Sequence, residues 1–277
     1  MSKINVLIVS KGHAYAHDSF LAMFEDMQGI TTTLVEQPAA QAVLQPEHTA
    51  AYDVVFFYDM SGIPGVGLTH DGANNTGIPP QPYVQAVEAL LEAGKGVLMV
   101  NHATVSWPLW PLWREIHGSS FMLAGGELNG EQVAGSGYRG GHGPLISATI
   151  ALIPQGDHPV LEGLDGGFEI TDELYLKTTA YEDHVLPLLR GDCEFVVENF
   201  SPPPLAPADE QANWDHPPGS DLVVWANHAG NSPVIVSDVG DGPLAYDNPS
   251  YRRLIENSIR WLASEQARQW VQSQSKN

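Results

Sequence analysis

Short apolar runs alternate with segments of helical spacing along most of this chain. The β-branched and apolar runs predict strands, at 4–10, 30–35, 53–58, 97–100, 147–152, 195–197, 222–225 and 233–239. Apolar residues three and four positions apart predict helices, at 18–27, 83–93 and 249–270, with a proline-broken helix at 106–117. This alternation predicts an α/β fold with a doubly wound, mainly parallel sheet. At 277 residues we expect a single domain, 1–277.

We predict that the run Val97–Val100 forms the central strand of the sheet. The turn Gly94-Lys95-Gly96 precedes it, and the polar pair Asn101-His102 ends it. Open parallel sheets bind their ligands at the carboxyl ends of the strands. We therefore expect His102 to lie beside a bound ligand, where it could take part in a reaction. The alternative is that His102 only caps the strand or hydrogen-bonds a loop.

Further histidines are expected at the same edge of the sheet. His13 and His17 follow the first strand, and His142 lies in a glycine-rich loop that could fold over the edge. His13, His102 and His142 could bind a divalent metal such as zinc, or histidines could act as general acid and base without a metal. The remaining histidines considered are expected at the surface: His48, His70, His117, His184 and His216.

Adjacent acids and an aromatic segment are also candidates for function. Asp172-Glu173 could act in catalysis or binding, or could only brace a loop by accepting backbone N–H groups. Trp107 and Trp110 lie in an aromatic stripe, which more often packs in a core than binds a ligand. The glycine- and proline-rich loop 59–82 is long enough to suggest a functional loop.

Composition narrows the class of partner. The formal charge of −21 disfavours nucleic acid and anionic membrane surfaces, although the acids could simply keep the protein soluble. We expect a cytoplasmic protein, since no apolar run is long enough to span a bilayer and no signal peptide is recognised. The single cysteine, Cys193, is interpreted as structural. No nucleotide-binding glycine motif and no Gly-x-Ser-x-Gly elbow occurs, so neither a nucleotide cofactor nor a serine hydrolase is expected.

Two consecutive segments resemble the signature of ThuA-like (trehalose utilisation) proteins. They are His158–Leu164 and Phe168–Tyr175, the second containing the specific run Ile-Thr-Asp-Glu-Leu-Tyr. Supporting segments cover nearly the whole chain: Gly12-His13 with His17, Gly94–Ala103, Val223–Trp225 and Asn248–Trp261.

The resemblance implies a flavodoxin-like fold of the class I glutamine amidotransferase type, with long loops over the carboxyl edge of the strands. In that fold the turn after the central strand carries a catalytic cysteine, whereas this chain has Asn101-His102. Glutaminase activity is therefore not expected. The resemblance instead implies a role in sugar metabolism, around trehalose and 3-keto-glycosides. The chain departs from the family pattern in two places, Gly230–Pro233 and Gly240-Asp241. At the second place the family usually has a glycine followed by a histidine, and Asp241 stands in the position of that histidine. Asp241 could still bind a metal or a sugar hydroxyl.

The combined hypothesis is an enzyme that acts on a sugar or keto-glycoside. The expected catalytic residues are His102, His13 and Asp172. The expected substrate-binding residues are His17, Asn101, Trp107, Tyr138, His142, Glu173 and Asp241. Two alternatives are a non-catalytic sugar-binding or assembly protein and a metal-dependent hydrolase of another polar substrate. Self-association into a homo-oligomer stays open.

Overall fold

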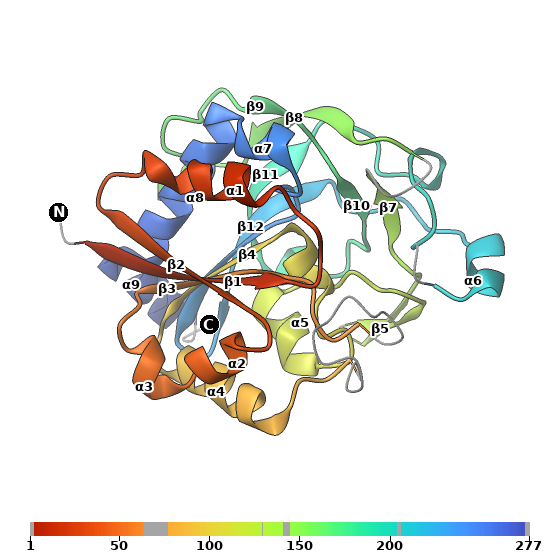
Figure 1. Ribbon diagram of the computed structural model, residues 1–277. Coiled ribbons are helices and arrows are strands. Elements are labelled where there is room, and N and C mark those ends of the chain that lie inside the picture. The colour runs from red at the N-terminus through yellow and green to blue at the C-terminus, as the bar shows by residue number, and fades with distance from the viewer. Residues whose placement is uncertain (1–2, 64–76, 129, 141–144, 204–205, 275–277) are drawn as a thin grey trace.

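A nine-stranded sheet runs through the middle of the computed structural model, which describes residues 3–63, 77–128, 130–140, 145–203 and 206–274 (Figure 1). The strand order is β2-β1-β3-β4-β13-β12-β11-β8-β9. The strands are β1 Ile4–Lys11, β2 Ile30–Glu36, β3 Val54–Asp59, β4 Gly96–Val100, β8 Ala148–Pro154, β9 Phe168–Asp172, β11 Leu186–Gly191, β12 Leu222–Ala229 and β13 Ser232–Ser237. Neighbours from β2 to β13 are parallel, and those from β13 to β9 are antiparallel. The predicted α/β fold class is confirmed.

Helices cover both faces of this sheet. The helices are α1 His17–Glu25, α2 Ala40–Val43, α3 Pro46–Thr49, α4 Gln81–Glu92, α5 Pro111–His117, α6 Ala208–Ala212, α7 Pro243–Tyr246, α8 Pro249–Leu262 and α9 Glu265–Gln274. One core cluster joins α1, α7 and α8 to the sheet, and a second joins α2, α4 and α5 to its other face. None of the helices in the described ranges is long and apolar enough to cross a membrane.

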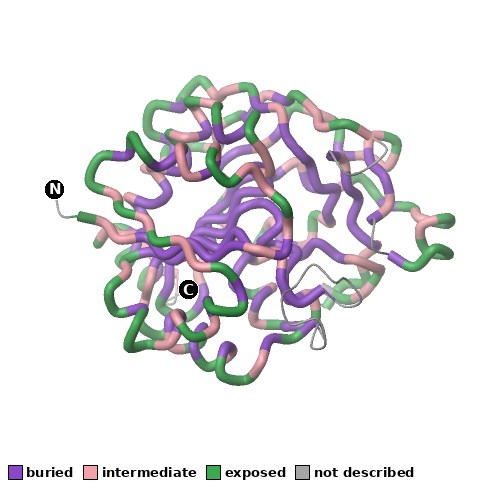
Figure 2. Tube along the Cα trace, viewed as in Figure 1, coloured by how far each residue is buried: buried purple, intermediate pink, exposed green. Residues whose placement is uncertain are grey.

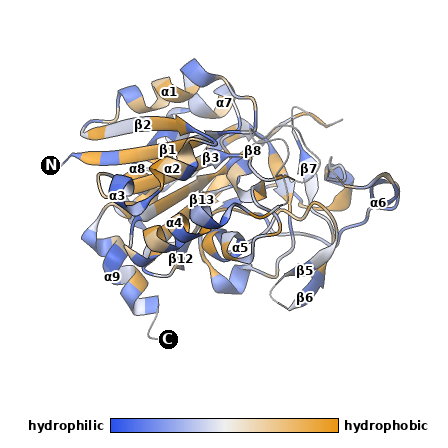
Figure 3. Ribbon diagram, turned by 60° about the horizontal axis from the view of Figure 1, so that its bottom comes forward, coloured by the Kyte–Doolittle hydropathy of each residue, from blue (hydrophilic) through white to orange (hydrophobic). Residues whose placement is uncertain are grey.

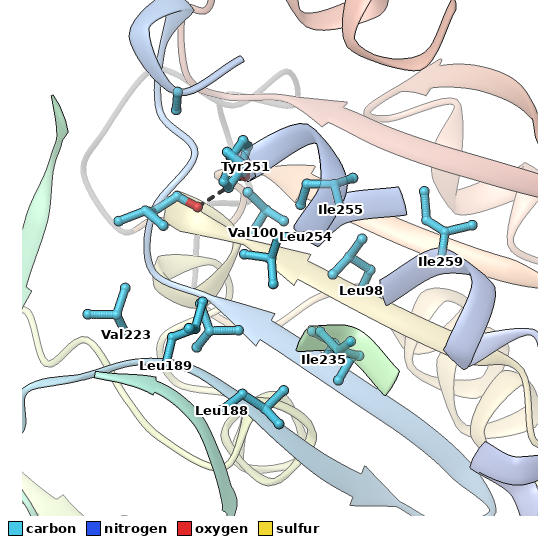
Figure 4. Packing of buried hydrophobic residues seen from close by; sticks show 14 of the residues in the cluster. Leu98, Val100, Leu188, Leu189, Val223, Ile235, Tyr251, Leu254, Ile255 and Ile259 are labelled. Carbon is cyan, nitrogen blue, oxygen red and sulfur yellow. Dashed lines mark hydrogen bonds between the residues drawn. The ribbon is translucent and has the colours of Figure 1, made fainter. Parts of the chain in front are cut away.

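The central strands are buried on both faces, as continuous apolar runs in parallel sheets require. Every residue of β3, β4 and β13 is buried, and Figure 2 shows this core as a continuous purple centre. Strands β3 and β13 are mostly hydrophobic in Figure 3, whereas α9 is largely hydrophilic. Figure 4 shows how α8 places Leu254, Ile255 and Ile259 over Leu98 and Val100 of β4. Each such side chain contributes about 1.5–3 kcal/mol to stability through burial.

Two of the predicted elements are wrong. No strand forms at 195–197, because Val197–Asn199 is a 3₁₀ turn; the strand in this region is β11, which precedes Cys193. The predicted helix 249–270 is two helices, and the hydroxyl of Ser264 accepts the N–H of Ala267 at the start of the second.

The segments on either side of α5 also differ from the prediction. Only Pro111–His117 of the aromatic segment is α-helical, and Asn101–Val105 is a 3₁₀ helix directly after β4. The glycine-rich stretch after α5 contains the short strands β5 Gly126–Leu128, β6 Glu131–Val133 and β7 Gly137–Arg139. β5 pairs with β6, and β7 pairs with β10 Leu174–Leu176, in two small antiparallel sheets.

Candidate functional site

Three sharp turns at the carboxyl edge of the sheet bring His13, His102 and Asp241 together. The turns follow β1, β4 and β13. Each of the three residues comes directly after a residue with left-handed backbone: Gly12 (φ 86°), Asn101 (φ 49°) and Gly240 (φ 127°). Glycine adopts this region without steric penalty, and asparagine tolerates it better than most residues. The turns therefore reverse the chain at once and aim the next side chain across the strand ends.

The three side chains form a compact set of two nitrogens and one oxygen. The imidazole rings of His13 and His102 stack, with centroids 4.4 Å apart and planes inclined by 25°. The Nδ1 atom of each ring lies 3.7 Å from Oδ1 of Asp241. The side chain of His102 is only 3% exposed, whereas those of His13 and Asp241 are 13% and 18% exposed. The set is thus sheltered on the His102 side and reachable on the other.

The hydrogen bonds of His102 fix which ring nitrogen carries its hydrogen. Nε2 lies 3.0 Å from the backbone carbonyl oxygen of Tyr58, which can only accept, so Nε2–H donates to it. On the neutral ring, Nδ1 then carries a lone pair. That atom faces Oδ1 of Asn101 at 3.0 Å and Oδ1 of Asp241 at 3.7 Å.

The amide of Asn101 is held so that its oxygen faces His102. Its Nδ2 donates to the backbone carbonyl of Asp238 at 2.9 Å. Its Oδ1 accepts from the backbone N–H of His102 at 2.7 Å and from the hydroxyl of Tyr175 at 3.0 Å. Nδ1 of His102 is therefore surrounded by oxygen acceptors, which is an environment for a proton or a metal cation.

Asp172, predicted to be catalytic, turns its carboxylate toward backbone amides. It accepts from the N–H of Gly240 at 2.5 Å, of Asp241 at 3.3 Å and of Glu173 at 2.8 Å. Burial raises the pKa of Asp172 to about 7, despite these bonds. This is the bracing role that the sequence left open as the alternative, and what Asp172 braces is the turn that carries Asp241.

Two tyrosines hold the carbonyl side of the same turn. The hydroxyl of Tyr58 donates to the carbonyl of Gly240 at 2.8 Å, and that of Tyr246 donates to the carbonyl of Asp241 at 2.7 Å. The two hydroxyls also contact each other. Nothing in the local sequence points to this pair, because β3 and α7 meet only in the folded chain.

Glu173 and Tyr138 lie next to the Asn101 side of the centre. Tyr138 is opposite Tyr175 in the β7–β10 pair, and both hydroxyls contact the carboxyl group of Glu173, that of Tyr175 at 3.4 Å. Burial and, after it, the charge of Asp241 raise the pKa of Glu173 to about 8. Glu173 is therefore linked through Tyr175 to the amide that faces His102.

A buried ion pair beside the centre was missed by the sequence reading. Lys177 Nζ lies 2.5 Å from Asp238 Oδ2 and 4.4 Å from the centre of the Trp225 ring, and both charged side chains are almost fully buried. The one available signal was an acid, Asp238, directly after a buried apolar strand. Its backbone carbonyl is the group that orients Asn101.

The other predicted site residues lie elsewhere or outside the described residues. Trp107 is 2% exposed and packs beside Tyr83 in the core, so in this arrangement its ring does not face a ligand. The side chain of His17 is 51% exposed at the start of α1, and its Nδ1 lies 3.4 Å from Oδ1 of the neighbouring Asp18. His142 lies outside the described ranges.

Two of the histidines expected at the surface are buried. His117 accepts the N–H of Ser119, and burial lowers its pKa well below the usual value. His216 contacts the carbonyl of Pro217 at 2.6 Å. Both are therefore held by local hydrogen bonds, while His48 and His184 are exposed and His70 is outside the described residues.

Comparison with known proteins identifies relatives of this chain. A family model described as trehalose utilisation, ThuA, matches residues 5–262. No curated protein matches the sequence. The structure resembles a putative ThuA-like protein from Parabacteroides merdae, with a TM-score of 0.62 and 14% identity over 95% of this chain and 91% of the other. A second putative ThuA-like protein, from Bacteroides uniformis, gives a TM-score of 0.61 and 18% identity over 95% and 93%.

A more distant similarity extends the comparison of the fold. The structure of PurLQS from Thermotoga maritima gives a TM-score of 0.50 and 12% identity over 94% of this chain and 99% of the other. At these identities the solved structures report on the fold alone, which is the ThuA-like and amidotransferase-like architecture expected from the sequence.

Proposed function

Because the chain belongs to the trehalose utilisation (ThuA) family, we propose that it is a cytoplasmic enzyme acting on a sugar or keto-glycoside. The reaction would take place at His13, His102 and Asp241. One observation carries this proposal: a buried imidazole, a second imidazole and a carboxylate converge at the carboxyl edge of the sheet, with Nδ1–Oδ1 distances of 3.7 Å. Open α/β sheets bind their ligands at this edge.

The chain's own residues suit chemistry centred on Nδ1 of His102. Tyr58 and Asn101 fix the ring, so this atom keeps one position while a substrate binds. A histidine held in this way can move a proton to or from a hydroxyl group. His13 and Asp241, the more exposed members, are the ones that a ligand would reach first. Glutaminase activity is not proposed, because the turn that carries the catalytic cysteine in the amidotransferase fold contains Asn101 in this chain.

The test is turnover of candidate sugars by the purified protein. Trehalose and its 3-keto derivative are incubated with the wild-type chain, and products are separated by chromatography and identified by NMR. His102→Ala should lower kcat/KM by about 10²–10⁴, the usual contribution of general acid–base catalysis. His48→Ala is the matched control, since His48 is exposed on α3, and its turnover should equal wild type. Full turnover by His102→Ala would contradict the proposal.

A second candidate function is sugar binding without catalysis. The observation that favours it is the amide of Asn101 in the turn after the central strand, whose oxygen and nitrogen are both held by hydrogen bonds. Under this alternative, sugars would raise the thermal unfolding temperature of the protein, and prolonged incubation would release no product.

A further inference from the structure

We propose that His13, His102 and Asp241 bind one divalent transition-metal ion. Their candidate ligand atoms all lie within 4.8 Å of one another. Zinc bonds to imidazole nitrogen and carboxylate oxygen are about 2.0–2.2 Å long, so ligands of one ion stand roughly 3–4 Å apart. The 3.7 Å separations of both Nδ1 atoms from Asp241 Oδ1 fall in this range. One ion can therefore contact all three atoms with small adjustments of the side chains.

The second ring nitrogen of His102 supports a metal at the first. A histidine that binds a metal through one nitrogen nearly always donates the other N–H to a carbonyl or carboxylate, which fixes the tautomer. Here Nε2–H donates to the carbonyl of Tyr58. Nδ1 is left with its lone pair, 3.0 Å from Oδ1 of Asn101 and 3.7 Å from Oδ1 of Asp241, in a side chain that is 3% exposed.

The alternative occupant of this position is a proton. An imidazolium at His102 would pair with Asp241, but the ring of His13 is stacked on it at 4.4 Å with Nδ1 at an equal distance from the same oxygen. Protonating both stacked rings would place like charges against each other. A single metal ion satisfies both nitrogens and the carboxylate together.

The types of ligand atom, and the residues that hold these ligands in place, indicate which metal to expect. Two imidazoles and one carboxylate leave coordination positions for water or substrate, as in catalytic zinc sites and in iron(II) sites of the same ligand type. Magnesium and calcium prefer oxygen ligands throughout. Asp172 and the hydroxyls of Tyr58 and Tyr246 hold the turn of Asp241, so this ligand is fixed before the ion arrives.

The experiment is a metal titration of the full chain, purified without a histidine tag and stripped with a chelator. Zn²⁺ binding is measured by calorimetry, and Co²⁺ binding by its visible absorption, which reports the ligand geometry. We expect one equivalent of each, with no competition from millimolar Mg²⁺. Asp241→Asn, which keeps the side-chain shape, should weaken binding at least about tenfold to hundredfold, a range reached even by changes beside metal ligands.

Controls separate loss of the site from loss of the fold. His13→Ala removes a partly exposed side chain and serves if His102→Ala does not fold; both are checked by circular dichroism. His48→Ala should bind zinc as tightly as wild type. The proposal is overturned if no saturable equivalent binds, or if Asp241→Asn binds zinc as tightly as wild type.

An ion on Nδ1 of His102 would occupy the atom that moves a proton in the proposed function, so zinc binding and turnover are measured separately. Stoichiometric zinc with no turnover of any sugar would refute the activity and leave the metal site standing. Turnover by protein that binds no metal would refute the metal site and leave the activity standing, with the imidazole–carboxylate pair as its acid and base.

Discussion

Replacing Gly240 by alanine should distort the turn that presents Asp241. Gly240 has φ 127°, in the region that side chains rarely adopt, and an added Cβ would lie 2.1 Å from the hydroxyl oxygen of Tyr251 and 2.6 Å from Cγ1 of Val100. Backbone strain of this kind costs about 1–3 kcal/mol. Displacing packed neighbours costs about 1–3 kcal/mol more. The free energy of unfolding should therefore fall by about 2–6 kcal/mol, a large part of the roughly 5–15 kcal/mol typical of a domain.

The assay is urea unfolding followed by circular dichroism and fluorescence, with zinc affinity measured on the same samples. Gly242→Ala is the matched control two residues away, because nothing lies within 4 Å of its added Cβ and its φ is −151°. That variant should stay within about 1 kcal/mol of wild type. Gly240→Ala should also bind zinc more weakly, since Asp241 moves with the turn. Equal stability and equal zinc affinity of the two variants would show that the backbone of Gly240 does not hold Asp241 in place.

Three further perturbations test the surroundings of the centre. Asp172→Asn leaves one side-chain oxygen for three backbone N–H donors, so zinc affinity should fall about tenfold. An unchanged zinc affinity in calorimetry would show that the turn of Asp241 holds without this carboxylate. Burial raises the pKa of Asp59 to about 6 from 3.8, so its contribution to stability is complete below pH 4 and is lost as the pH rises through 6. Between pH 4 and pH 8, wild type should therefore lose about 3 kcal/mol more unfolding free energy than Asp59→Asn does. Parallel pH profiles of the two proteins in urea unfolding would contradict this. Lys177→Met leaves the buried carboxylate of Asp238 without its partner and should lower the free energy of unfolding by about 3–5 kcal/mol. The double variant with Asp238→Asn should recover part of this loss. Strictly additive losses in a double-mutant cycle would show that the pair is not coupled.

The sequence predicts the parallel half of the sheet well and the antiparallel half less well. Strands β1, β3, β4 and β13 are continuous apolar runs because both of their faces are buried, and such runs are readable without knowledge of the fold. β11 contains Pro187 and Arg190 and is buried only in part, so its pattern is weak. Phe195–Val197 is apolar because Phe195 packs into the core from a loop.

The candidate site shows the same limit at the level of single residues. Histidines after the first and central strands were predicted to share an edge, since parallel strands end together. Asp241 joins them because Gly240 takes a left-handed backbone, which spacing alone does not specify. The direction of the Asp172 carboxylate depends on amides that come from a distant turn. Tyr58 and Tyr246 contact each other across 188 positions of sequence, so no local pattern could have paired them.

The most direct test of the centre is a crystal soaked in zinc and measured at the zinc absorption edge. We predict one anomalous peak about 2.0–2.2 Å from Nδ1 of His13, Nδ1 of His102 and a carboxylate oxygen of Asp241. Zinc found only at exposed histidines such as His48, with His102 hydrogen-bonded directly to Asp241, would contradict it.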